Sequence, residues 1–112
     1  MSRSAQERLD DIVEAVTAIR NHLAKGTLEE EVVVDAVRMR LLEIGEAVKC
    51  LDSAVLATEP DIPWKQIARM RDHLAHRYFL SSTDILAETV KTDLGLLLAA
   101  TQRLRDRVDT GN

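Results

Sequence analysis

Apolar residues recur at steps of three and four along most of the chain, and this helical period restricts the fold more than any other feature. No segment shows the alternation of apolar and polar residues expected of a half-buried strand, and the chain has no internal repeat and no glycine-rich phosphate loop. The period predicts four amphipathic helices. These cover residues 4–24, a long segment from the capping box of Thr27 and Glu30 to Val55, a third helix after Pro63, and a fourth after the hydroxyl-rich residues 80–84.

This pattern predicts an all-α protein, an antiparallel four-helix bundle formed by a single domain over residues 1–112. A chain of 112 residues that is 46% hydrophobic and 30% charged is long enough for one ordinary core. It has no apolar leader and no long uninterrupted apolar run, so we expect a cytoplasmic protein without a membrane span. Trp64, Met39 and the single cysteine, Cys50, are predicted core residues.

The segment "GLLLAA", residues 95–100, is apolar around the whole circumference of the predicted fourth helix. Such a segment requires burial on more than one side. A second copy of the chain would supply the second side, which favours a homodimer. A short helix crossing within the same chain is the alternative.

Charge is distributed unevenly along the chain, although the net charge is only −4. Residues 1–61 carry seven basic against thirteen acidic side chains, whereas residues 62–80, which we call the basic island, carry four against one. We predict that Lys65, Arg69 and Arg77 of the island contact an RNA phosphate backbone, which the rest of the surface repels. A solvated helical face without a ligand is the alternative.

The island ends in "RDHLAHRYF", residues 71–79, which contains two arginines and two histidines. Arginine with histidine suits RNA cleavage by internal transesterification, which needs neither a metal nor a cofactor. Arg71 would hold the phosphate, and His76 would act as base or acid near neutral pH. The alternative makes Arg71 a surface ion-pair partner and His76 a histidine at a helix end. On one continuous helix Tyr78 lies within about 20° of Arg71 and His76 about 140° away, so the helix must loosen or two chains must share the site.

Two segments, "RMRLLEIGEAVKCL" (38–51) and "IPWKQIARMRDHLAHRYF" (62–79), resemble the HepT-like toxin family, and Arg71-x4-His76-x-Tyr78 resembles the HEPN ribonuclease signature. The resemblance implies a dimeric HEPN-like bundle whose active site forms between two protomers. It also implies a metal-independent endoribonuclease that is the toxin of a type VII-like toxin-antitoxin pair. Arg71 and His76 then become the catalytic pair. Tyr78 becomes the residue to which a cognate nucleotidyltransferase antitoxin transfers AMP from ATP.

Asp72 departs from the pattern of the family, in which many members have asparagine after the arginine. Asp72 either orients Arg71 or His76, or is a solvated helix residue. A second functional hypothesis also stays open: a noncatalytic HEPN protein that binds a nucleotide or a nucleotidyltransferase, with the basic island as its docking surface. RNA cleavage by the purified protein would separate the two hypotheses.

Overall fold

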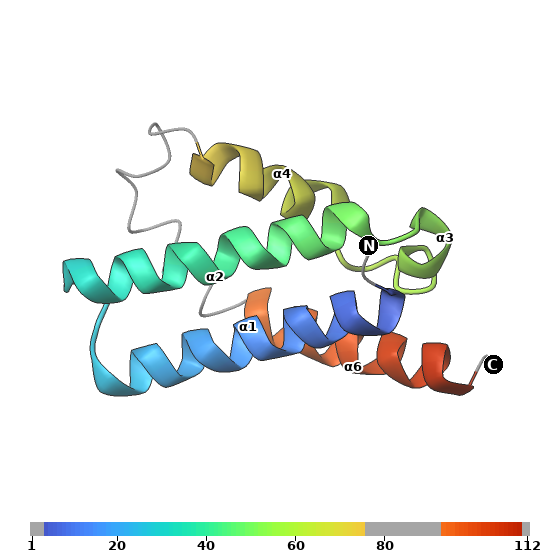
Figure 1. Cartoon of the computed structure of the whole chain (residues 1–112), viewed down its shortest axis with the longest axis horizontal. Coiled ribbons are helices and arrows are strands. Elements are labelled where there is room, and N and C mark those ends of the chain that lie inside the picture. Colours follow the sequence, from blue (N-terminus) through green and yellow to red (C-terminus); the bar gives the residue numbers. More distant parts are fainter. Residues whose placement is uncertain (1–3, 76–92, 111–112) are drawn as a thin grey trace.

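The described part of the chain consists of helices joined by short turns (Figure 1). The structure is a computed structural model that describes residues 4–75 and 93–110, with the side chains of residues 4–69 and 93–108. No strand occurs within these ranges, so the all-α prediction is confirmed for them. The helices are α1 (Ala5–Lys25), α2 (Glu31–Cys50), α3 (Ser53–Leu56), α4 (Trp64–Ala75) and α6 (Leu94–Thr110).

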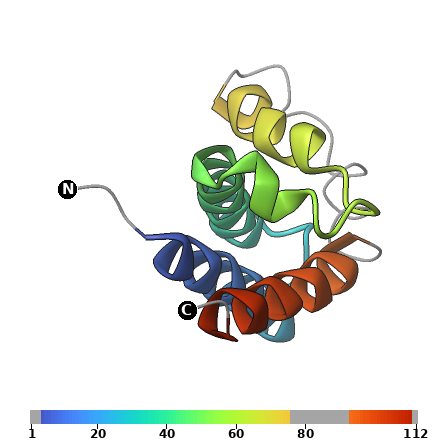
Figure 2. The same ribbon diagram turned by 90° about the vertical axis from the view of Figure 1, so that its right-hand side faces the viewer.

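Four of the helices lie in a curved row, in the order α4, α2, α1, α6 (Figure 2). Each helix of the row runs antiparallel to its neighbour, so the C-terminal end of α2 lies beside the N-terminal half of α4 (Figure 1). The predicted start of the fourth helix lies outside the described ranges. Within them, α6 covers the later part of that prediction. The closed four-helix bundle stays a prediction.

The core consists of the apolar stripes that the helical period predicts. Among its members, Thr101 is buried without a loss of hydrogen bonding, because its hydroxyl donates to the carbonyl oxygen of Leu97 at 2.7 Å. The core includes Leu9, Ile12, Val16 and Ile19 of α1, Val37, Leu41, Ile44 and Val48 of α2, and Leu94, Leu97 and Leu104 of α6.

The ends of α1 follow from local chemistry. Ser4 caps the first turn: its hydroxyl accepts from the backbone N–H of Glu7, whose carboxylate accepts in turn from the N–H of Ser4. The helix ends at Lys25, one residue beyond the predicted range of 4–24. The next residue, Gly26, is held close to α2, because a Cβ atom there would lie 2.8 Å from a methyl group of Val33. Only glycine fits this approach without a shift of its neighbours.

The long second helix of the prediction is wrong at both ends. At the start, Thr27 and Glu30 form a turn in which the Glu30 carboxylate accepts from the Thr27 N–H at 3.3 Å, and α2 begins only at Glu31. At the other end α2 stops at Cys50, because the side chain of Asp52 accepts from the N–H of Ala54 at 2.9 Å and so caps a new helix, α3. The apolar period continued across this break and concealed it.

Two predicted core residues of α2 are instead exposed. Met39 has 56% of its surface exposed, and Cys50 is an exposed free thiol. Both lie off the buried stripe, since Cys50 follows Val48 by two residues and therefore lies about 160° around the helix from it. Trp64 is buried as predicted, at 8% exposure, and its indole N–H donates to the carbonyl oxygen of Glu59 at 2.9 Å.

Glu59 joins the segment before α4 to α6. Its carboxylate is nearly buried and accepts from Arg103 through Nε at 3.1 Å and Nη2 at 2.7 Å, while Arg107 Nη1 lies 2.7 Å from Oε2. Arg107 also donates to the hydroxyl of Thr58 at 3.1 Å. The hydrogen bonds from the two guanidinium groups lower the pKa of Glu59 from its ordinary 4.5 to about 2.

The low pKa of Glu59 predicts how stability changes with pH. Because the folded state favours the carboxylate, the cluster stabilises the fold at neutral pH, and this contribution is lost as the pH falls from about 4.5 to about 2. We expect Glu59→Gln to unfold at lower urea concentration than the wild type at pH 7. The difference between the two proteins should shrink over that acid range when unfolding is followed by circular dichroism.

A matched control for this prediction is Glu43→Gln. Glu43 also pairs with an arginine, Arg40, at 3.0 Å, but both side chains are more than a third exposed and lie three residues apart on one helix. Exposed pairs of this kind contribute roughly 0–1 kcal/mol. If both variants lose stability equally at pH 7, the special role of Glu59 is refuted.

Candidate functional site

The basic island begins on α4, whose start is fixed by three local contacts. Pro63 precedes the first helical residue, and its carbonyl oxygen accepts from the N–H of Ile67 at 3.1 Å. Trp64, the first residue of α4, is anchored in the core and hydrogen-bonded to Glu59. These contacts fix both where α4 begins and which of its faces turns toward α2.

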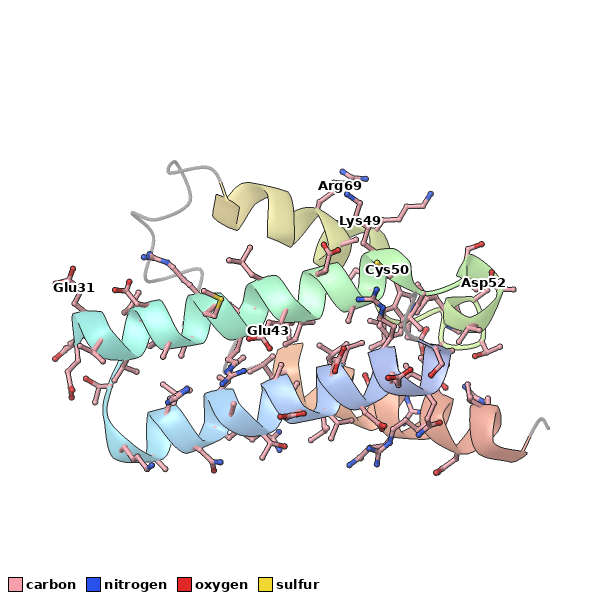
Figure 3. All side chains as sticks on the ribbon, viewed as in Figure 1. Glu31, Glu43, Lys49, Cys50, Asp52 and Arg69 are labelled. Atoms are coloured by element: carbon pink, nitrogen blue, oxygen red, sulfur yellow. The ribbon has the colours of Figure 1, made fainter. Side chains whose placement is uncertain are left out.

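Lys65 and Arg69 of the predicted RNA-binding set lie on the outer face of α4. Both side chains are exposed, and the four-residue spacing puts them within about 40° of each other. No ion pair joins either of them to another residue whose side chain the structure describes. In Figure 3 the side chain of Arg69 points away from the row of helices. Both positive charges therefore lie at the surface of this face of α4.

Position 71 lies on the face of α4 opposite to Lys65 and Arg69. It follows Trp64 by seven residues and Ile67 by four, so it shares their side of the helix to within about 40°. Trp64 is buried and Ile67 is partly buried against the core, whereas Lys65 and Arg69 lie about 120° and 160° from position 71. The helix thus separates the position of Arg71 from the outer pair, which the sequence pattern had grouped together.

The remaining predicted site residues are only partly within the described structure. Arg71 and Asp72 belong to α4, and position 72 shares the side of Lys65 because seven residues separate them, but their side chains lie outside the described set. His76, Arg77 and Tyr78 lie outside the described residues. Of the predicted set, the structure therefore brings together Lys65 and Arg69, and the catalytic assignments stay predictions.

The described ranges also bear on metal binding and on membrane insertion. No group of three or more His, Cys, Asp or Glu side chains lies close enough to hold a metal ion there. None of the helices in those ranges combines the length and the apolar character that crossing a membrane requires.

Lys49 is a charged residue near α4 that the sequence pattern did not single out. It lies in the last turn of α2 and is exposed, as is its neighbour Cys50 (Figure 3). The helical period of α2 contained the signal, because Lys49 and Cys50 both fall outside the stripe that includes Ile44 and Val48. Because Cys50 is predicted to be a core thiol, this end of α2 is not predicted to be an exposed surface.

Comparison with known proteins identifies a family over nearly the whole chain. The model of the family described as "Ribonuclease HepT-like" matches residues 5–104. A protein of Thermococcus cleftensis named "Probable ribonuclease HepT" is 36% identical over 109 residues, which are 94% of this chain and 99% of that protein.

Two relatives from Methanocaldococcus jannaschii also have names that include a putative RNase. One named "Putative RNase MJ1216" is 35% identical over 96 residues, which are 82% of this chain and 79% of the relative. Another, named "Gamma-glutamylcyclotransferase and putative RNase MJ0434", is 29% identical over 97% of this chain, which spans only 51% of that protein. No solved structure matches the chain.

Proposed function

This chain belongs to the HepT-like ribonuclease family, and from that premise we propose that it is a metal-independent endoribonuclease, the toxin of a HEPN/nucleotidyltransferase toxin-antitoxin pair. The observation that carries the proposal is the position of Arg71-x4-His76-x-Tyr78 within the matched residues 5–104. The exposed Lys65 and Arg69 on the same helix support it, because they supply positive charge for an RNA strand in an otherwise acidic chain.

The proposed reaction is an internal transesterification. A base, one His76, takes the proton from the 2′-OH of the RNA, and the 2′-oxygen bonds to the adjacent phosphorus. The bond from phosphorus to the 5′-oxygen then breaks, and an acid returns a proton to that leaving oxygen. Arg71 stabilises the additional negative charge on the phosphoryl oxygens in the transition state. The products are a 2′,3′-cyclic phosphate and a 5′-hydroxyl.

Cleavage by the purified protein tests this proposal. We expect RNA to be cut in excess EDTA and a substrate with 2′-deoxyribose at the scissile position to stay intact, because the nucleophile is the substrate's own 2′-OH. Arg71→Ala and His76→Ala should each reduce the rate at least about a hundredfold. Product ends are identified by mass spectrometry, and circular dichroism checks that the variants remain folded.

His73→Ala is the matched control, because His73 lies in the same nine-residue segment and has no role in the mechanism. It should retain most of the activity. Full dependence on added Mg²⁺ would rule out the proposed mechanism. Wild-type activity in His76→Ala would favour the noncatalytic HEPN protein that binds a nucleotide or a nucleotidyltransferase.

A homodimer forms part of the proposal, and α6 supplies its support. Leu97 and Ala100 are buried within the chain, whereas Leu96 is 65% exposed and Ala99 is exposed beside it. The chain itself therefore covers one side of this apolar segment and leaves an apolar surface on the other. A second protomer packed there would bury Leu96.

The exposed position of Leu96 makes it the appropriate residue for testing the dimer. We expect the wild type to sediment as a dimer and Leu96→Glu to sediment as a folded monomer, because a charge would have to be buried in the interface. Val32→Glu is the control, since Val32 is 80% exposed on α2 and should not affect association. A monomeric wild type that cleaves RNA would contradict the shared active site.

Tyr78 is the proposed site of control by the antitoxin. Its phenolic oxygen would attack the α-phosphorus of ATP, forming the Tyr–AMP bond as pyrophosphate leaves and the phenolic proton is lost. The attached phosphate and purine would exclude RNA by charge and by volume. We expect intact-mass spectrometry to show AMP on the wild type and none on Tyr78→Phe, which should keep its activity in the presence of antitoxin and ATP. The same mass increase on Tyr78→Phe would place the acceptor elsewhere.

A further inference from the structure

Three exposed cations lie on two neighbouring helices, two on the N-terminal half of α4 and one at the end of α2 that packs beside it. Lys65 and Arg69 belong to the outer face of α4, and Lys49 belongs to the last turn of α2. Because α2 and α4 pack side by side and run antiparallel, the end of α2 lies level with this part of α4 (Figure 1). In the view of Figure 3, Lys49 and Arg69 both lie in the region where the end of α2 meets the N-terminal half of α4. We call these three residues the outer cation group.

The charges of the outer cation group are not compensated by ion pairs within the described structure. All three side chains are exposed, and no ion pair links any of them to another described residue. Two carboxylates close to Lys49 in sequence make other hydrogen bonds: Asp52 accepts from the N–H of Ala54 at 2.9 Å, and Glu46 accepts from the thiol of Cys50 at 3.8 Å. Among the described side chains, Lys49, Lys65 and Arg69 therefore have no ion-pair partner, which leaves a surface with three cations of two helices for an external polyanion.

The outer cation group lies away from the position of the proposed catalytic arginine. Position 71 is on the α2-facing side of α4, about 120–160° around the helix from Lys65 and Arg69. Six residues separate Lys65 from position 71, which corresponds to about 9 Å along the axis. One phosphate cannot contact both surfaces, so a ligand of the outer cation group that also reaches position 71 must be an extended strand.

We propose that the outer cation group binds backbone phosphates of the RNA substrate on one flank of the cleaved bond, with Lys49 as a contact from α2. This inference rests on the proposed ribonuclease function and adds that the substrate is a strand longer than the cleaved dinucleotide. Trp64, the only Phe, Tyr or Trp in the described residues, is buried and so offers no stacking surface to a base. The proposed contacts of the three cations are with phosphates and are therefore electrostatic and independent of base sequence.

The salt dependence of RNA binding tests the role of Lys49. The assay uses full-length Arg71→Ala protein, which does not cleave, and a fluorescent single-stranded RNA titrated at several salt concentrations. Each lost phosphate contact on a single strand lowers the slope of log affinity against log salt by about 0.7, equivalent to about fivefold in affinity at 0.1 M salt. We expect this change on adding Lys49→Ala. Lys25→Ala, at the far end of the helix row, is the matched control and should leave the slope unchanged.

Cys50 provides an independent second measurement, because it is exposed, adjacent to Lys49, and the chain's single cysteine. A photo-crosslinker attached to its thiol should join the protein to the RNA. The same group on Val32→Cys, in a Cys50→Ser background, should not, since Val32 lies at the opposite end of α2. An unchanged salt slope in Lys49→Ala, or equal cross-linking from both positions, would overturn the inference.

These measurements separate the inference from the proposed function. If wild-type protein cleaves RNA but Lys49→Ala keeps the salt slope, the proposed phosphate-binding role of the outer cation group is refuted and the ribonuclease proposal stands. If wild-type protein does not cleave RNA but Lys49→Ala weakens RNA binding, the phosphate-binding role of the outer cation group stands and the ribonuclease proposal is refuted. If Lys49→Ala weakens binding of the nucleotidyltransferase and not of RNA, the surface belongs to a protein partner and the inference is overturned.

Discussion

The ion cluster of Glu59 with Arg103 and Arg107 connects parts of the fold that the row of helices alone would leave apart. α6 packs on α1, and α4 packs on α2, so the two helices lie at opposite ends of the row. Glu59 reaches from the segment before α4 to an arginine 44 residues further along the chain. Its backbone carbonyl oxygen accepts from Trp64, so a single residue fixes α6 through its side chain and α4 through its main chain.

The rotation of α4 follows from this anchor and determines which charges face outward. With Trp64 buried, the helical period turns Lys65 and Arg69 to the outside and places position 71 on the side that faces α2. The proposed roles use this division: one face of α4 would hold the reacting phosphate, and the other would bind phosphates along the strand.

The sequence was informative where burial alone decides the structure, and less so where local hydrogen bonds compete with it. The periodic stripes predicted α1, the core of α2 and the buried residues of α6, because each stripe needs only one apolar face. The break after Cys50 was missed because Leu51 and Leu56 stay buried across it, while the Asp52 cap ends the helix. The pairing of Glu59 with α6 depends on tertiary contact and leaves no pattern in the sequence. Of the candidate site, the spacing predicted the exposed Lys65 and Arg69 but not their separation from position 71.

The uneven charge of the chain has a further consequence for how an RNA strand would approach. The segment up to residue 61 carries a net charge of −6, and exposed Glu29, Glu30 and Glu31 lie together near the start of α2. In the proposed complex, a strand would be repelled there and attracted at the opposite end of α2, where Lys49 adjoins α4. This gradient favours entry of the strand from the Lys49 side. Electrostatic steering of this kind raises the rate of association and weakens with salt, whereas contacts at the reacting phosphate would act on the chemical step.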